Sequence, residues 1–219
     1  MHGTAHLASA GSDVWYYGAV FVLGWTLMTV AMMLPTVVPL LVLFRRMVER
    51  RTNSVVLLSL VVGGYLVVWV LFGIFVQLVN RWLARGLLPG GWTASPWIPA
   101  TAILTVAGLY QFSSLKYACL EKCRTPMSFI ISRWQGGAEH VQALRIGLDH
   151  GVFCVGCCWS LMLLMFLVSA GSLGWMALLG VVMAIEKNFS WGRHVSKPIG
   201  AMLLAAAAFV TSRGLYQGT

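Results

Sequence analysis

Long apolar runs constrain the fold of this chain more than any other feature of its sequence. Each run provides, or nearly provides, the ~20 residues that a helix needs to cross a bilayer. We place about six predicted spans at roughly 14–44, 54–80, 97–115, 145–169, 172–190 and 198–214. No internal repeat or low-complexity segment divides them. The sequence therefore predicts an all-α fold, a polytopic membrane helix bundle that forms a single integral membrane domain over residues 1–219.

The overall composition also indicates a membrane protein. Hydrophobic residues make up 59% of the chain and charged residues 10%, and the mean hydropathy is +0.82, whereas soluble domains contain about 25% charged residues. Residues 1–12 contain no Lys or Arg, so the first apolar run is interpreted as an uncleaved span rather than a signal peptide. The net charge of +9 does not indicate a nucleic-acid partner, because the basic residues cluster in short loops between spans.

The distribution of basic residues predicts the topology. Loops 45–53, 116–144 and 187–197, with Arg145 at the border of the second loop, hold twelve of the 15 Lys and Arg residues. The other three are Arg81, Arg85 and Arg213. Because Lys and Arg are enriched in cytoplasmic loops, we expect these three loops in the cytoplasm and both termini on the non-cytoplasmic side.

One of the predicted helices carries a stripe of soft metal ligands. His150, Cys154, Cys157, Cys158 and Met165 lie in the fourth run at spacings that bring them to one side of a helix. At about 100° per residue they fall within an arc of roughly 100°. Thiols, an imidazole and a thioether on one face of a membrane helix suit a soft ion such as Cu(I). The stripe therefore predicts a metal site.

Two methionines in the first span form a second set of candidate ligands. Pro35 and Pro39 each free a carbonyl one turn earlier, so this part of the helix is expected inside the bundle. Met32 and Met33 lie just before the first proline, although core packing alone would also explain a methionine pair. At 1.5 Å per residue, Met32 and Cys158 both lie roughly 18–20 Å from the inner boundary. We therefore expect the first and fourth helices to pack together with their sulfur atoms close.

The remaining cysteines, Cys119 and Cys123, form a pair just after the third span. Their spacing of four places both on one face if the helix continues, and the neighbouring Lys122 and Arg124 favour the thiolate. The predicted topology puts this pair in the reducing cytoplasm, where cysteine clusters more often bind metal or do redox chemistry than form stable disulfides. Two unrelated thiols are the alternative interpretation.

Acidic residues and missing motifs narrow the chemistry further. Asp149 is a candidate acceptor for His150, although adjacent residues on a helix point about 100° apart. Glu186 with Lys187 is interpreted as an interfacial pair rather than as part of a site. The sequence contains no Gly-Xaa-Ser-Xaa-Gly, no phosphate-binding loop and no His-Glu-Xaa-Xaa-His, so nothing indicates hydrolysis. A binding role is favoured over an enzymatic one.

Several short motifs resemble those of a known family. They are AMMLPT at 31–36, LK at 115–116, CLEKCRTP at 119–126, HG at 150–151, CVGCCW at 154–159 and EK at 186–187. In spelling and order they resemble a bacterial family of predicted metal-binding integral membrane proteins, catalogued as a domain of unknown function, some of whose members carry a copper-chaperone label. The resemblance spans roughly residues 20–190. It implies a multi-pass protein of the bacterial inner membrane and adds no mechanism.

Three functional classes remain open from the sequence. The first is Cu(I) trafficking or delivery to a copper-dependent client. In it Cys154, Cys157 and Cys158, helped by His150 and the Met32/Met33 pair, bind the ion and pass it to or from Cys119 and Cys123. The second is a membrane thiol oxidoreductase that uses Cys154 and Cys157 as its dithiol. The third is an accessory subunit of a larger membrane complex. The proposed metal ligands of the first class are Cys154, Cys157, Cys158, His150, Met32, Met33, Cys119 and Cys123.

The ion itself is the remaining question. Zinc stays open, because Cys and His bind it well, but it prefers closed tetrahedral sites and has no use for methionine. The expected partners are therefore a metal ion, with Cu(I) favoured, the lipid bilayer and a client or complex partner.

Overall fold

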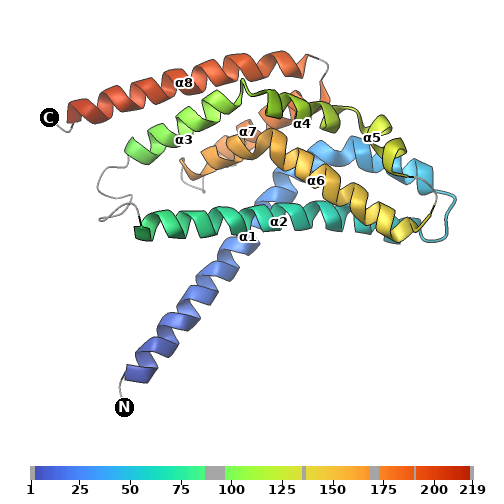
Figure 1. Cartoon of the computed structure of the whole chain (residues 1–219), viewed down its shortest axis with the longest axis horizontal. Helices are drawn as coiled ribbons and strands as arrows, with labels where there is room; N and C mark the ends of the chain where they lie inside the picture. The colour runs from blue at the N-terminus through green and yellow to red at the C-terminus, as the bar shows by residue number, and fades with distance from the viewer. Residues whose placement is uncertain (1–2, 87–96, 135–136, 168–172, 190, 218–219) are drawn as a thin grey trace.

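The computed structural model describes residues 3–86, 97–134, 137–167, 173–189 and 191–217, and no β-strand occurs among them. In chain order the helices are α1 (Gly3–Val48), α2 (Ser54–Gly86), α3 (Trp97–Tyr110), α4 (Ser114–Arg124), α5 (Pro126–Arg133), α6 (Glu139–Leu163), the 3-10 turn η1 (Leu164–Phe166), α7 (Leu173–Asn188) and α8 (Gly192–Gln217). The predicted all-α class is confirmed (Figure 1).

Four of the described helices are long and apolar enough to cross a membrane, within Tyr16–Val48, Ser54–Trp82, Glu139–Leu163 and Gly192–Gly214. Helices α3 and α4 qualify together as a fifth span, but they are bent by 64°, so the run predicted at 97–115 is not one straight helix. The predicted run at 172–190 corresponds to α7, which has 16 residues; residues 172 and 190 lie outside the described part. The structure thus supports four or five spans there, and the predicted six are not confirmed.

Helix α1 has two parts with different surroundings, and its prolines lie in the part that is packed inside the bundle. Pro35 and Pro39 lie inside the helix, where each removes a backbone donor and favours a kink. In Figure 1 the N-terminal part of α1 extends away from the other helices, and its C-terminal part runs among them. α1 packs against α2, α5 and α7, and Met33 and Phe44 are fully buried. This confirms the expectation that the proline-containing segment lies inside the bundle.

Helices α2 and α6 approach closely because glycine faces the contact. A Cβ added at Gly147 of α6 would collide with the backbone carbonyl of Val61 on α2. A Cβ added at Gly64 of α2 would lie 2.7 Å from the carbonyl oxygen of Leu144 on α6. Small residues let helix backbones approach in this way. The close pairing brings the side chains of α2 within reach of the cysteine stripe on α6.

The segment 116–144, expected as a cytoplasmic loop, is largely helical in the structure. Ser113 caps α4 by accepting a hydrogen bond from the backbone N–H of Leu115 at 3.2 Å, and Pro126 begins α5, where its missing N–H costs no helical bond. α4 packs on α6 at Gly156, where an added Cβ would stand 2.6 Å from Cys119 Sγ. The charge-based expectation of a loop was wrong, and both cysteines of α4 therefore lie against the bundle.

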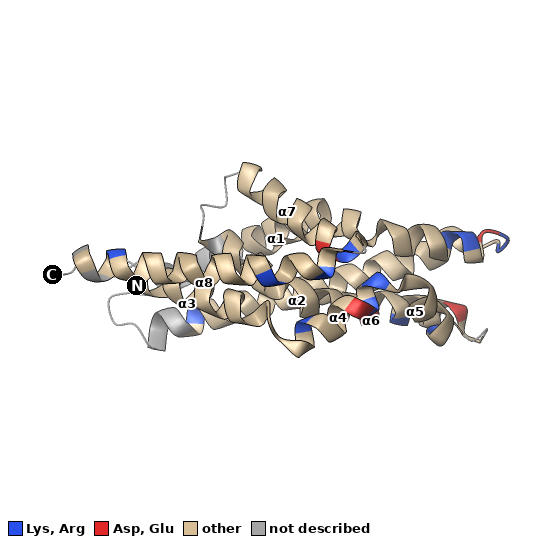
Figure 2. Cartoon of the chain, turned by 90° about the horizontal axis from the view of Figure 1, so that it is seen from above, with Lys and Arg blue, Asp and Glu red and all other residues tan. Residues whose placement is uncertain are grey.

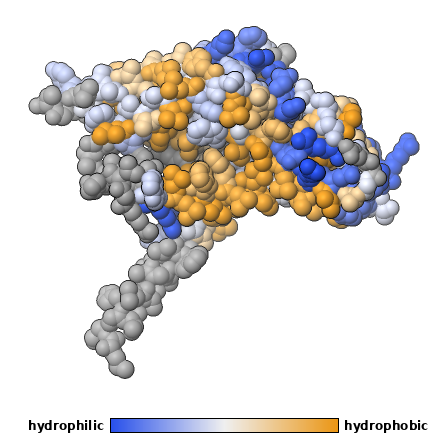
Figure 3. Space-filling model, viewed as in Figure 1, coloured by the Kyte–Doolittle hydropathy of each residue, from blue (hydrophilic) through white to orange (hydrophobic). Residues whose placement is uncertain are grey.

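Charge and hydropathy divide the surface along the bundle. Figure 2 shows Lys and Arg concentrated in the half of the molecule that holds α5 and the α1–α2 connection, with few near the C-terminus. Figure 3 shows a broad hydrophobic area across the face between the two ends. Exposed apolar side chains such as Leu71 and Phe75 of α2 contribute to the apolar surface. This distribution is typical of a bundle that meets lipid along its length and a basic loop face at one end.

Candidate metal centre

Sulfur atoms from three helices meet in the interior. Met33 Sδ of α1 lies 3.8 Å from Cys158 Sγ of α6, and Cys123 Sγ of α4 lies 3.9 Å from Cys157 Sγ of α6. We call these the inner pair and the outer pair. The expected meeting of the methionine and cysteine sets is confirmed for Met33. Cys123, which the sequence placed in the cytoplasmic loop, joins the stripe as well.

The two pairs are linked by the backbone of α6. Cys157 and Cys158 are neighbours in sequence, and both thiols donate to the carbonyl oxygen of Cys154, at 3.2 and 2.7 Å. These are local bonds within one helical turn. All three cysteines are buried, whereas Cys123 is half-buried. Within the two pairs, Cys123 is therefore the only residue that is not fully buried.

Lys187 places an ammonium group beside the third cysteine. Its Nζ donates to Cys154 Sγ at 2.8 Å and to Thr36 Oγ1 at 3.3 Å, and it lies 3.9 Å from Met33 Sδ. Tyr65 Oη lies 3.1 Å from the same Cys154 sulfur. The interpretation of Lys187 as an interfacial charge was wrong, because the residue is only 5% exposed.

A spacing signal in α7 could have found Lys187. Leu179, Met183 and Lys187 follow one another at intervals of four and share a helix face, and all three are buried. Lys187 therefore continues the buried face of α7, although its charge alone suggests an exposed position.

Glu186 is also buried, but it belongs to a separate polar cluster. Its carboxylate accepts from Lys116 Nζ at 2.8 and 2.9 Å and from Ser196 Oγ at 2.7 Å. Lys116 also donates to Gln111. The cluster joins the α3–α4 bend to α7 and α8, because its members come from all of these segments. It fixes the end of α7 that presents Lys187.

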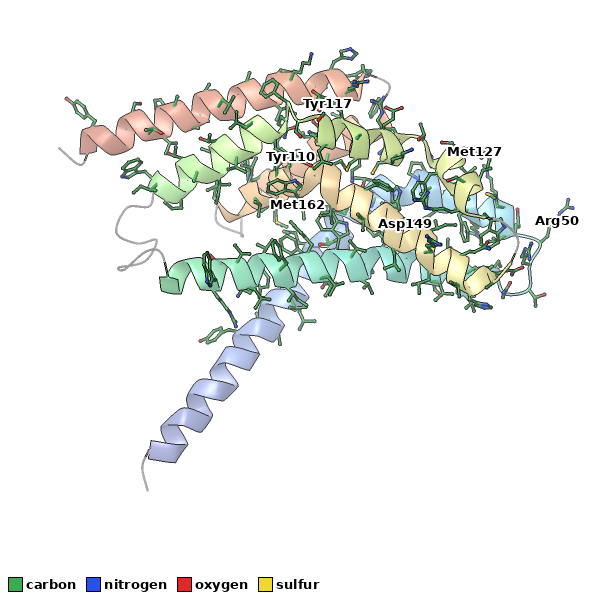
Figure 4. All side chains as sticks on the ribbon, in the orientation of Figure 1. Arg50, Tyr110, Tyr117, Met127, Asp149 and Met162 are labelled. Carbon is green, nitrogen blue, oxygen red and sulfur yellow. The ribbon has the colours of Figure 1, made fainter. Side chains whose placement is uncertain are left out.

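His150 lies near the centre, and one nitrogen of its ring is unpaired among the described residues. Its ring stands 6.1 Å from the ring of Tyr65 and 5.5 Å from that of Phe129, between centroids, and its Nδ1 has no hydrogen-bond partner among the described residues. Asp149 does not orient it, since Asp149 accepts from Arg133 Nε of α5 at 2.5 Å. Figure 4 shows Asp149 on α6.

A cavity of about 140 Å³ connects several of these groups. Cys123, His150 and Lys187 line it together with Arg124 and Asn188. The His150 imidazole, the half-buried thiol of the outer pair and the ammonium beside Cys154 therefore share one space. Of the sulfur atoms in the two pairs, only that of Cys123 belongs to a residue that lines this cavity.

The structure leaves other predicted ligands outside the sulfur pairs. Met32 faces α7, where its Cε would lie 3.7 Å from a Cβ added at Gly180. Cys119 lies beside Gly156, one turn before Cys123. Met165 is buried, but it falls in η1 after the end of α6 and does not continue the helical stripe.

The sulfur pairs differ from a preformed cage. In the part of the chain that the structure describes, no three His, Cys, Asp or Glu side chains form a group that could hold a metal ion. A zinc–thiolate bond is about 2.3 Å long, so two bonds of that length to one ion can bridge sulfur atoms at most about 4.6 Å apart. The separations of 3.8 and 3.9 Å are thus within the reach of a single two-coordinate ion.

The sequence also matches the model of a known protein family. The PpoB2 family model, described as copper chaperone, matches residues 22–210. The chain belongs to this copper chaperone family. No curated protein and no solved structure matches it. The match to the PpoB2 copper chaperone family agrees with the resemblance seen in the sequence motifs, and it includes every sulfur atom of the inner and outer pairs.

Proposed function

We propose that this chain is a membrane copper chaperone that holds Cu(I) between pairs of sulfur atoms and passes it from one pair to the other. The observation that carries the proposal is the coexistence of the inner pair, Met33 and Cys158, with the outer pair, Cys123 and Cys157. Because Cys157 and Cys158 are adjacent on one helix, an ion held by either pair has its next ligand close by.

The chemistry of the ligands favours Cu(I) over zinc. Thiolates and thioethers are soft ligands that select Cu(I). Zinc takes four ligands in a structural site and three protein ligands in a catalytic one, whereas the described residues offer pairs and no group of three His, Cys, Asp or Glu. A thioether such as that of Met33 is a useful soft ligand in a copper site, whereas it contributes nothing to a zinc site.

The proposed route begins at the outer pair. Cys123 is half-buried and lines the cavity of about 140 Å³, so within the two pairs it is the thiol that an incoming or departing ion meets first. Ligand exchange then moves the ion to Cys157, and from there to Cys158 and Met33. A bacterial inner-membrane location, with the basic loops in the cytoplasm, would let Cys123 exchange copper with a client on that side.

The decisive experiment replaces both linking cysteines. We expect Cys157→Ser with Cys158→Ser to abolish tight Cu(I) binding, because a hydroxyl is hard and does not ionise near neutral pH. Binding is measured by Cu(I) titration of the purified, detergent-solubilised chain against a competing chelator under anaerobic, reducing conditions. Cys119→Ser serves as the matched control and is expected to keep the affinity. Unchanged affinity in the double variant would remove the site from α6.

A thiol oxidoreductase is the second candidate, and the outer pair is the observation that favours it. A disulfide requires sulfur atoms about 2.05 Å apart, so Cys123 and Cys157 would need to approach from 3.9 Å. This function predicts a reversible disulfide that is lost in Cys157→Ser and no copper bound by the parent protein. Mass spectrometry after blocking free thiols, combined with the titration above, separates the two functions.

A further inference from the structure

The buried ammonium of Lys187 has no carboxylate to neutralise it. Among the described residues, no Asp or Glu lies within ion-pair distance of Lys187, whereas the other buried lysine, Lys116, pairs with Glu186 at 2.8 Å. A buried charge is costly unless it is paired. The partner that the structure supplies is Cys154 Sγ at 2.8 Å, a group that carries negative charge only as a thiolate.

Metal binding changes the charge beside this ammonium. Thiols lose their protons when they bind metal, so Cu(I) forms a centre of net charge −1 on the two thiolates of the outer pair and a neutral centre on Cys158 and the uncharged thioether of Met33. Together with the ammonium of Lys187, the charge sums to zero at the outer pair and to +1 at the inner pair. A divalent ion raises each sum by one, which adds positive charge beside an ammonium that has no carboxylate partner among the described residues.

We infer that Lys187 makes the sulfur centre selective for a monovalent soft ion over a divalent one. The inference rests on the proposed function and deepens it by assigning the charge of the cargo. Lys187 acts as a positioning and specificity residue, since its ammonium does not bind the ion and instead sets the charge that the site accepts.

The surrounding contacts hold the ammonium in place. Thr36 Oγ1 donates to the carbonyl oxygen of Met33 at 2.7 Å, which leaves its lone pairs free to accept from Lys187. On α7 the preceding residue, Glu186, is bound to Lys116 and Ser196. These contacts fix the end of α7 and keep the lysine from withdrawing to solvent, so its charge acts on every ion that enters.

The test compares two ions on the full-length chain in detergent. Ag(I) serves as a soft monovalent probe without redox chemistry, and Zn(II) serves as the divalent probe. We expect Lys187→Leu to lower the ratio of Ag(I) to Zn(II) affinity by at least about tenfold, because a unit positive charge a few ångströms away repels a divalent ion more strongly than a monovalent one. Lys187→Arg keeps the charge and is expected to keep the ratio.

Several outcomes distinguish the inference from a structural role. A merely structural role of Lys187 would lower both affinities together and leave their ratio unchanged, and that result overturns the inference. If Lys187→Leu does not fold, Lys187→Gln removes the charge while keeping a polar contact to Thr36, and the same shift in ratio is expected. A parent protein that binds neither Ag(I) nor Cu(I) refutes the proposed function itself, whereas a parent that binds both with an unchanged ratio in the variants refutes only the role of Lys187.

Discussion

Met32 and Met33 are neighbours in the sequence and have different partners in the structure. Met33 Sδ lies 3.8 Å from Cys158 Sγ, whereas Met32 packs toward Gly180 of α7. We predict that Met33→Leu weakens Cu(I) binding by roughly tenfold, equal to about 1.4 kcal/mol, because leucine matches methionine in volume but offers no sulfur. Met32→Leu is the matched control. Equal losses in the two variants, measured by chelator competition, would show that Met33 has no special role.

Residue identity alone explains only part of the centre. Softness and helical spacing were enough to select Cys157, Cys158 and Met33 from the sequence. Lys187 was missed because a charged residue at the end of an apolar run is usually interfacial, and its place beside Cys154 depends on the packing of α7 against α1 and α6. The contact between Cys123 and Cys157 could not be predicted from the sequence either, because it depends on the bend between α3 and α4.

Helices α4, α7 and α8 are held together by a buried ion pair. Removing one partner leaves the other charge buried and unpaired, which costs about 3–5 kcal/mol. We therefore predict that Lys116→Met markedly lowers the unfolding temperature of the detergent-solubilised protein, measured by circular dichroism. Combining it with Glu186→Leu should recover most of the loss, since neither charge remains. A double variant that is less stable than Lys116→Met would contradict this account.

Helices α2 and α6 can pack closely because glycine lies where their backbones meet. Gly147→Ala places a Cβ against the backbone carbonyl of Val61, and forced repacking of this kind costs about 1–3 kcal/mol. We predict a lower unfolding temperature for this variant. Gly63→Ala is the matched control on α2, because a Cβ there meets nothing within 4 Å. Its alanine should be neutral or slightly stabilising, by up to about 1 kcal/mol, from helix propensity.

Elements were predicted well where apolar runs were long and poorly where runs were short or charged. The runs behind α1, α2 and α6 exceed the length that a span requires, so their existence follows from hydropathy alone. The run predicted at 198–214 was shorter, and α8 extends beyond it at both ends, over Gly192–Gln217. The segment 116–144 was expected as a loop because of its lysines and arginines. Its helices form because Ser113 caps α4, Pro126 begins α5, and Gly156 lets α4 pack against α6.

At the scale of the whole molecule, the topology depends on how many elements cross the membrane. Four helices are long and apolar enough to cross, the bent pair α3–α4 would make a fifth, and α7 with 16 residues extends about 24 Å at 1.5 Å per residue. That is short of a hydrocarbon core of about 30 Å. Because α8 starts soon after α7 ends, the side on which the C-terminus lies depends on whether α7 crosses.

The basic residues predict that α7 crosses and that both termini face away from the cytoplasm. Lys116 and Lys187 are buried and no longer count as loop charges, but the loop 45–53 still carries Arg45, Arg46, Arg50 and Arg51, and Figure 2 shows few basic residues near the C-terminus. A phosphatase fused after Thr219 should therefore be active, since that enzyme works only outside the cytoplasm, and a fluorescent protein fused at the same point and exported unfolded should be dark. The same reporters inserted at Asn53 should give the reverse pattern. A cytoplasmic signal from the Thr219 fusion, with the Asn53 insertion behaving as expected, would mean that the chain has an odd number of spans, so that either α7 or the bent pair α3–α4 does not cross.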